Sequence, residues 1–378
     1  MWTVSEPKRK GERILIKQLI KQRSSNFELL RIIFIVLILF CHNVDFLVMP
    51  DWARWIGYFG KASNHGFFLL SGYFLVNSKI DVKSVIKREV KVLVPGLFYA
   101  ILFIPISLFI YSQIAPWRTA RMDYIKFVLT SPTGLFEYLI RGGGFFFLET
   151  YILVILISPI LIFITRKLFE KLGKWSLILG FFVILFFYIC EPAWENRLTP
   201  LFRLIGFGLT FAFGCLMRKA VSEEKWSVKS KTISILALCF IVIYIAFTTH
   251  PSEILHIQLP FFFQADPNTI PMGSIWAFLF AVIIVYVFKN IHIKYNKVIN
   301  KVATTVFPVY LIHTNFLIGG TTFWFMDILH SGEIGIHFWP YVPLATFGLG
   351  VVFVFVDLIL QKVYKPLMNK IANLNILN

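Results

Sequence analysis

Long apolar runs separated by short polar segments extend over most of the 378-residue chain. Each run approaches the length of a membrane-crossing helix, which needs roughly 20 mostly apolar residues. The pattern therefore predicts an all-α protein, a polytopic transmembrane helical bundle of about ten spans. The predicted spans lie near residues 29–49, 62–78, 92–112, 145–165, 175–190, 201–217, 232–248, 270–288, 302–318 and 341–360.

Composition and charge placement support a membrane protein and orient it. The chain is 57% hydrophobic and 15% charged, whereas soluble domains carry about 25% charged residues. Of the 37 Lys and Arg residues, 28 fall in the tails and loops of one predicted side and seven in the loops of the other. Because basic residues gather on the cytoplasmic side, we expect both termini there. The net charge of +17 then indicates contact with anionic lipid, and we expect no nucleic-acid partner.

The domain organisation follows from the spans. We expect residues 1–28 to form a basic cytoplasmic tail, residues 29–360 the ten-helix domain, and residues 361–378 a cytoplasmic C-terminal tail. The first tail is too long and too charged for a cleaved signal peptide, so we expect the first span to stay in the mature protein. The four cysteines lie in or beside apolar spans without metal-ligand spacing, and no metal site is expected.

Arg31 and His42 bracket ten mostly apolar residues at the start of the first span. Their separation of eleven positions is about three helical turns, which places both side chains on one face, roughly 16 Å apart. Ionisable groups inside a membrane are costly and usually functional. We therefore interpret His42 as a catalytic candidate with Arg31 as its partner, although Arg31 alone would equally suit a membrane-surface anchor. Asp45 is close enough in sequence to orient the imidazole.

Two further segments place polar groups in or beside predicted spans. Ser71 and Gly72 interrupt the apolar run at 67–74, where small residues permit close helix packing or a helix break. Arg88 and Lys91 lie three positions apart at the predicted cytoplasmic mouth of the third span, and hence on one helical face. Such a pair can bind a diphosphate, although anchoring by the positive-inside rule explains it equally well.

Three more residues are candidates for an acceptor pocket. Tyr310 and His313 are three positions apart in the ninth predicted span, so they share a face. A second histidine within a membrane helix makes a single accidental polar residue less plausible. Glu149 lies inside the fourth predicted span, where an unpaired carboxylate is expensive.

Four segments together resemble the acyltransferase-3 family of multipass membrane O-acyltransferases. They are ELLR at 28–31 followed by His42, FFLLSGY at 67–73, FFL at 146–148 with Ser158-Pro159, and YLIH at 310–313. Each motif alone is weak, but all four occur in the family's order. The chain departs from the pattern at Lys91, where the family has a second arginine, and at Phe146, where a tryptophan is common. Glu149 has no counterpart in that pattern.

The resemblance implies transfer of an acyl group, usually acetyl, from cytoplasmic acyl-coenzyme A to a hydroxyl of a cell-surface, exported or lipid-linked glycan. It implies His42 as the essential catalytic residue, Arg31 as its partner, and Arg88 and Lys91 in donor binding. We place Ser71 with the donor site too. Acetyl-coenzyme A would be the donor substrate, and the protein a multi-pass protein of the plasma membrane. We expect it to deliver acyl groups alone or with separate polysaccharide-synthesis proteins.

Several alternatives stay open. His42 could act as a general base on the acceptor hydroxyl or carry the acyl group covalently. Either role needs a neutral imidazole, which the ordinary histidine pKa of about 6.5 permits. A transporter or flippase for a lipid-linked sugar would also use intramembrane His and Glu, although the chain has no internal repeat of the kind many transporters carry. A non-catalytic partner in an envelope-glycan complex would keep the fold and lose the chemistry.

Overall fold

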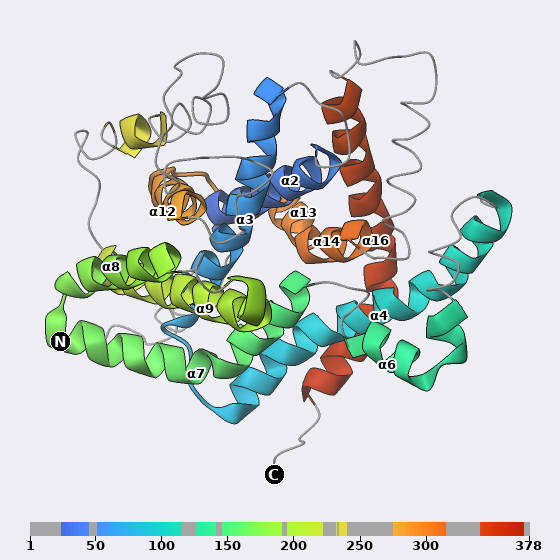
Figure 1. Ribbon diagram of the computed structural model, residues 1–378, viewed down its shortest axis with the longest axis horizontal. Helices are drawn as coiled ribbons and strands as arrows, with labels where there is room; N and C mark the ends of the chain where they lie inside the picture. Colours follow the sequence, from blue (N-terminus) through green and yellow to red (C-terminus); the bar gives the residue numbers. More distant parts are fainter. Residues whose placement is uncertain are drawn as a thin grey trace, which may run out of the picture.

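The regular secondary structure in the described part of the chain is all α-helix, joined by short turns and irregular segments (Figure 1). The computed structural model describes residues 24–44, 51–114, 126–140, 146–190, 195–221, 232, 234–239, 275–314 and 341–373, and no strand occurs among them. The helices are α2 (Ser25–Val44), α3 (Asp51–Leu75), α4 (Val82–Ile114), α6 (Pro132–Ile140), α7 (Phe146–Leu172), α8 (Trp175–Cys190), α9 (Glu195–Val221), α12 (Ile275–Asn290), α13 (Lys297–Ala303), α14 (Val306–Thr314) and α16 (Tyr341–Asn373).

Five of the described helices are long and apolar enough to cross a membrane. They contain the segments Ser25–His42, Val82–Ile106, Phe147–Leu172, Leu201–Val221 and Pro343–Ala372. In the last segment only 11% of the most apolar window is buried inside the protein, although its mean hydropathy is 2.2. Exposure of such a large apolar surface to water is unfavourable, whereas contact of the same surface with lipid is not. These properties are those of a multi-pass membrane protein. The predicted span at 232–248 lies mostly outside the described residues.

Two apolar clusters hold the bundle together, and α2 and α3 contribute to both. One cluster joins them to α4, α7, α9, α14 and α16, and the other joins them to α8, α9 and α12. Figure 1 shows α2 and α3 crossing near the centre, with α16 on one side and α8 and α9 on the other. The two clusters meet at α2, so that helix, which carries Arg31 and His42, is held from both sides.

Two glycines allow α3 and α9 to approach closely. A Cβ atom on Gly72 would collide with the backbone carbonyl of Phe211, and one on Gly214 would collide with the carbonyl of Leu69. Removing the side chain lets helix backbones touch, as is common between membrane helices. Of the two possibilities raised for Ser71 and Gly72, close packing is the one found, because α3 continues to Leu75 without a break.

The ninth predicted span is interrupted. A continuous helix was expected over 302–318, but α13 ends at Ala303 and α14 begins at Val306. Pro308 explains the break, because its ring would clash with the carbonyl of Thr304 in a continuous helix. The Thr304 and Thr305 hydroxyls instead bond to the carbonyls of Lys301 and Val302 at 2.8 and 2.7 Å. Residues 315–340 lie outside the described part.

The last helix is longer than predicted. The expected span ended at residue 360, but α16 continues through the residues assigned to a tail and ends at Asn373. Lys362, Lys365 and Lys370 are therefore arranged on a helix. This extension brings the lower half of α16 alongside α4, as Figure 1 shows.

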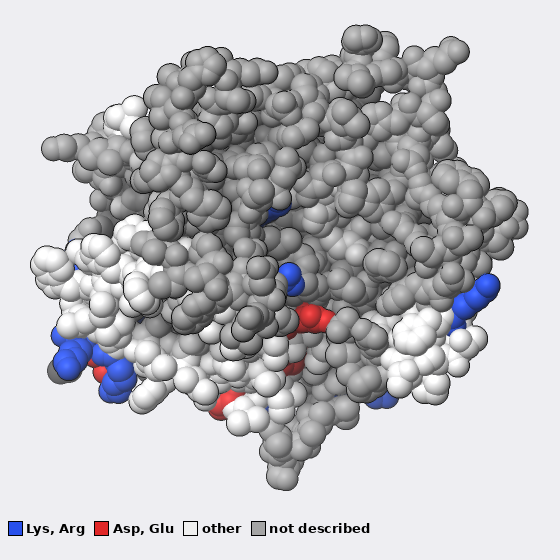
Figure 2. All heavy atoms as spheres, viewed as in Figure 1, with Lys and Arg blue, Asp and Glu red and all other residues white. Residues whose placement is uncertain are grey.

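Basic side chains gather at the end of the molecule where α7 turns into α8 (Figure 2). Arg166 lies there and points inward instead of toward solvent. Its Nε donates to the carbonyl of Val76 at 2.9 Å, and its Nη2 donates to the carbonyl of Ser78 at 2.8 Å. The guanidinium thus satisfies carbonyls just beyond the C-terminal end of α3, where helical partners are missing.

Candidate functional site

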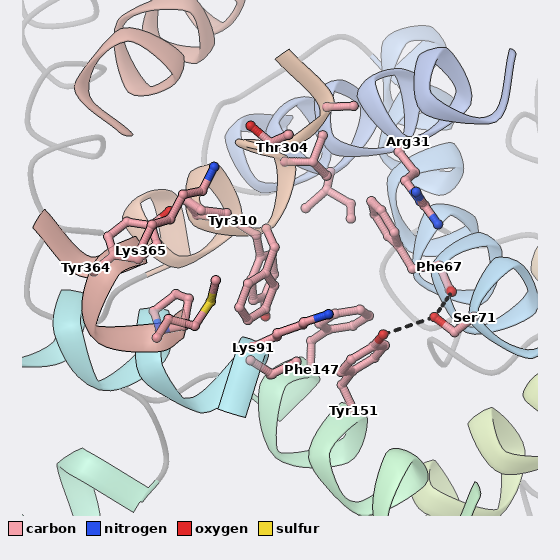
Figure 3. Close-up of a pocket in the computed structure, with 18 residues that line it drawn as sticks. Arg31, Phe67, Ser71, Lys91, Phe147, Tyr151, Thr304, Tyr310, Tyr364 and Lys365 are labelled. Atoms are coloured by element: carbon pink, nitrogen blue, oxygen red, sulfur yellow. Dashed lines mark hydrogen bonds between the residues drawn. The ribbon is translucent and has the colours of Figure 1, made fainter. Parts of the chain in front are cut away.

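A cavity of about 450 Å³ lies among α2, α3, α4, α7, α14 and α16 (Figure 3). This volume is in the range of sites that bind small molecules and cofactors. Of the residues singled out in the sequence, Arg31, Ser71, Lys91 and Tyr310 line it. They come from four different helices, so tertiary packing creates the site.

The cavity lining is basic. Arg31 from α2, Lys91 from α4 and Lys365 from α16 contribute the only charged side chains among its described lining residues, and none of these residues is acidic. Arg31 also forms an ion pair with buried Glu28, with 2.6 Å between Nη1 and Oε1. That pair fixes the guanidinium, and Figure 3 shows it directed from α2 toward Ser71. Glu28 offsets part of the Arg31 charge, but Lys91 and Lys365 leave the lining with a net positive charge, which favours an anionic ligand.

Ser71 is held in a hydroxyl pair. Its Oγ donates to the carbonyl of Phe67 at 2.8 Å and lies 3.1 Å from the Oη of Tyr151 (Figure 3). Tyr151, on α7, also lines the cavity and was not recognised in the sequence. The serine expected at the donor site and Tyr151 thus form a pair of hydroxyl groups, the polar floor of the cavity, between α3 and α7.

His42 and His313 contact each other directly. Their rings lie nearly parallel, with centroids 5.1 Å apart, and Nε2 of His313 is 3.0 Å from Nδ1 of His42. His313 is buried, with 4% of its surface exposed. The two histidines were assigned in the sequence to different groups, one catalytic and one in an acceptor pocket. In the structure α2 packs against α14, and the two histidines form one hydrogen-bonded pair.

The histidine pair lies next to one end of the basic cavity. Ile38 and Tyr310 line the cavity, and each is one helical turn from a member of the pair. Ile38 precedes His42 by four positions on α2, and Tyr310 precedes His313 by three on α14. The Arg31–Ile38–His42 face of α2 therefore leads from the basic cavity to the imidazoles, which matches the spacing argument from the sequence.

Two of the other singled-out residues lie outside the described lining of the cavity. Arg88 directs Nη2 to the carbonyl of Lys79, at 3.1 Å. Glu149 is partly buried in the first turn of α7. Asp45 falls outside the described residues.

A buried carboxyl group on α16 was missed in the sequence. Asp357 is fully buried, and its Oδ1 accepts hydrogen bonds from the hydroxyls of Tyr99 and Tyr364 at 2.7 and 2.8 Å. Its Oδ2 accepts a bond from Nε2 of Gln361. The signal was present, because Asp357 is the one acidic residue in the apolar run at 341–360, and such residues are rarely incidental.

The basic cavity, the adjoining histidines and the exposed apolar helices together form a candidate active site in a membrane protein. The model of the acyltransferase domain family Acyl_transf_3 matches residues 24–361, nearly the whole chain. The chain therefore belongs to the acyltransferase-3 family, as its motifs indicated, and the family points to a membrane acyltransferase. Searches of curated proteins and of solved structures found no match.

Proposed function

We propose that this protein is a membrane O-acyltransferase that moves an acyl group, most simply acetyl, from acyl-coenzyme A to a hydroxyl of a cell-surface, exported or lipid-linked glycan. The single observation that carries the proposal is the His42–His313 pair, one helical turn from a cavity with three cations and no described acid. Family membership supports acyl transfer, and the basic lining supports a phosphorylated donor.

The proposed topology has ten spans with both termini in the cytoplasm, in the plasma membrane. The distribution of Lys and Arg supports it, because the positive-inside rule assigns the tails and their neighbouring loops to the cytoplasmic side. Lys91 and Lys365 belong to these cytoplasmic segments. The basic end of the cavity would then open to the compartment that contains acyl-coenzyme A.

In the proposed donor complex, coenzyme A cannot enter hydrocarbon with its phosphates, so these stay at the basic end near Arg31 and Lys91. The pantetheine arm extends past Ile38 and Tyr310 toward the histidines. The roughly 16 Å between Arg31 and His42 along α2 suits an extended arm of this kind. Ser71 and Tyr151 offer hydroxyls for hydrogen bonds to its amides.

In the proposed reaction, His42 is the general base. The Nδ1–H of His42 donates to Nε2 of His313, which leaves the Nε2 lone pair of His42 free to take the proton of the acceptor hydroxyl. The hydroxyl oxygen attacks the thioester carbonyl, a C–O bond forms, and the C–S bond breaks. The coenzyme A thiolate leaves and takes up the proton. Glu149 is placed on the acceptor side, whereas Tyr310 borders the donor arm and His313 orients His42.

The proposal is tested by replacing His42 with alanine at unchanged expression level. We expect His42→Ala to lower the rate of glycan acylation about 10²- to 10⁴-fold, the usual contribution of a general base. The measurement follows radiolabelled acetyl from acetyl-coenzyme A into the glycan fraction of membranes. His292→Ala is the matched control, because His292 is exposed between α12 and α13 and should leave the rate unchanged.

Other outcomes would favour the rival functions. Unchanged acylation in His42→Ala would exclude the catalytic proposal. Loss of glycan export together with unmodified glycan retained inside the cell would indicate a transporter or flippase. Normal binding of glycan with no acylation by the wild type would indicate a non-catalytic partner in an envelope complex.

A further inference from the structure

The α16 side of the cavity contains a cation that no motif in the sequence had indicated. Lys365 lines the cavity opposite α2, and Figure 3 shows its side chain reaching over the cavity edge toward Thr304. Its Nζ donates to Oε1 of Gln361 at 2.6 Å. This hydrogen bond fixes the position of the ammonium group at the cavity.

Gln361 can accept that bond only in one orientation of its amide. Its Nε2 donates to Oδ2 of Asp357 and lies 3.3 and 3.4 Å from the Oγ1 and carbonyl oxygen of Thr304. A carboxylate oxygen accepts hydrogen bonds and does not donate, so Asp357 fixes the amide nitrogen on its own side. The amide oxygen is consequently fixed on the side of Lys365.

Asp357 in turn is held by two tyrosines from two helices. Tyr99 comes from α4 and Tyr364 from α16, and both hydroxyls donate to Oδ1. All three described donors to this carboxyl group are themselves buried, with Tyr99 at 0%, Tyr364 at 3% and Gln361 at 3% exposure. A fully bonded buried network of this kind is rigid and is sensitive to the loss of any one member.

We infer that Lys365 is the third ligand of a diphosphate site formed with Arg31 and Lys91, and that Asp357 is a positioning residue that sets Lys365 through Gln361. The inference deepens the proposed function and rests on it, because that function identifies the diphosphate with acyl-coenzyme A. Three cations from α2, α4 and α16 surround one cavity, which suits two linked phosphates better than a single carboxylate. A lipid-linked saccharide diphosphate has the same chemistry and is distinguished by the test.

The test measures binding of coenzyme A to the full-length protein in detergent. We expect Lys365→Gln to weaken binding about tenfold or more, which is the loss of one hydrogen bond to a charged group. The matched control is Lys362→Gln, because Lys362 is exposed on the same helix and does not line the cavity. Coenzyme A binding that is equal in Lys365→Gln and wild type would overturn the assignment of Lys365.

The positioning role of Asp357 is tested by a double-mutant cycle. We expect Asp357→Asn to weaken coenzyme A binding in the wild type and to have no further effect in Lys365→Gln, because coupled residues are not additive. Equal losses in both backgrounds would overturn the positioning role. If Asp357→Asn does not fold, Gln361→Leu interrupts the same relay and should give the same non-additivity with Lys365→Gln.

Two probes separate this inference from the proposed function. Binding of pyrophosphate and of a polyprenyl-diphosphate sugar, but not of coenzyme A, with the same dependence on Lys365, would support the diphosphate site and refute the acyl-coenzyme A donor. Coenzyme A binding that is independent of Lys365 would refute the site and leave the donor standing. No binding of any diphosphate by the wild type would refute the site.

Discussion

The 3.0 Å contact between His42 and His313 restricts where protons reside on the two rings. One of the two facing nitrogens must donate and the other must accept. If His42 donates through Nδ1, its Nε2 is free to act as a base, and if His313 donates, the Nε2 of His42 carries the proton instead. In the proposed mechanism His313 is therefore a positioning residue that selects the reactive tautomer of His42.

A pair of substitutions at His313 tests this role. We expect His313→Ala to lower kcat about 10- to 10²-fold, short of the full general-base contribution, with little change in the KM for acetyl-coenzyme A. His313→Gln, whose amide oxygen can accept the His42 Nδ1–H, should recover part of the rate. The release of coenzyme A under steady-state conditions measures both constants. A rise in KM with unchanged kcat would instead indicate substrate binding.

At the level of helices, the close backbone contacts at Gly72 of α3 and Gly214 of α9 fix the position of Ser71. Gly72 follows Ser71 directly and packs against the Phe211 backbone, so α3 cannot shift without moving α9. Cys215 adds to this contact, because its Sγ donates to the carbonyl of Gly72 at 3.3 Å. The polar floor of the cavity therefore depends on the contact between these two helices.

Replacement of Gly72 by alanine tests the importance of that packing. We expect Gly72→Ala to destabilise the protein by about 1–3 kcal/mol, because the added methyl group has no space between the backbones. Gly348→Ala is the control, since a Cβ there would meet no atom within 4 Å in the described structure. Thermal unfolding of both variants in detergent gives the comparison, and equal melting temperatures would contradict the close-packing argument.

Sequence patterns predicted helix type well and helix interruptions poorly. The run at 175–190 coincides with α8, because an uninterrupted apolar segment has little choice of structure in a membrane. The break before α14 was not predicted, because the apolar sequence continues across it. The proline at position 308 was the sequence signal for the break. The extension of α16 beyond residue 360 was not predicted, because the lysines there suggested a polar tail and their helical spacing was not considered.

The candidate site was predictable where its residues share a helix and not where they meet across helices. The common face of Arg31 and His42 followed from helical periodicity alone. The contact of His42 with His313 did not, because it depends on how α2 and α14 pack. Asp357 was detectable as a charged residue in an apolar run, and Gln361 and Lys365 follow it at spacings of four on the same helix. The bond from Tyr99 to Asp357 was not predictable, because it depends on the packing of α4 against α16.

For the whole molecule, the exposed apolar surfaces of α7, α8 and α16 are the faces expected to contact lipid. Leu156, Phe186 and Phe355 are 56%, 69% and 63% exposed, respectively. Most of the described basic residues lie instead in loops and near helix ends, as at Lys79, Lys167 and Lys219. In the proposed topology, the Lys365 end of the cavity faces the cytoplasm.

Cysteine labelling tests this orientation. In a variant without its natural cysteines, we expect Lys297→Cys to react with a membrane-impermeant maleimide only after the membrane is opened. Lys126→Cys, at an exposed position in a loop predicted on the other side, should react in intact cells. The reverse pattern would invert the topology and would exclude a cytoplasmic donor at Arg31 and Lys91.

The short helix α14, which begins just after α13, lies between two parts of the site. α14 has nine residues, so it is about 13 Å long at 1.5 Å per residue. Its near end adjoins Thr304, which contacts Gln361, and its far end carries His313. The nine residues of α14 therefore connect the lysine that lines the basic cavity, through Gln361 and Thr304, to the imidazole pair. One short helix thus sets the separation between the proposed site of donor binding and the proposed site of proton transfer.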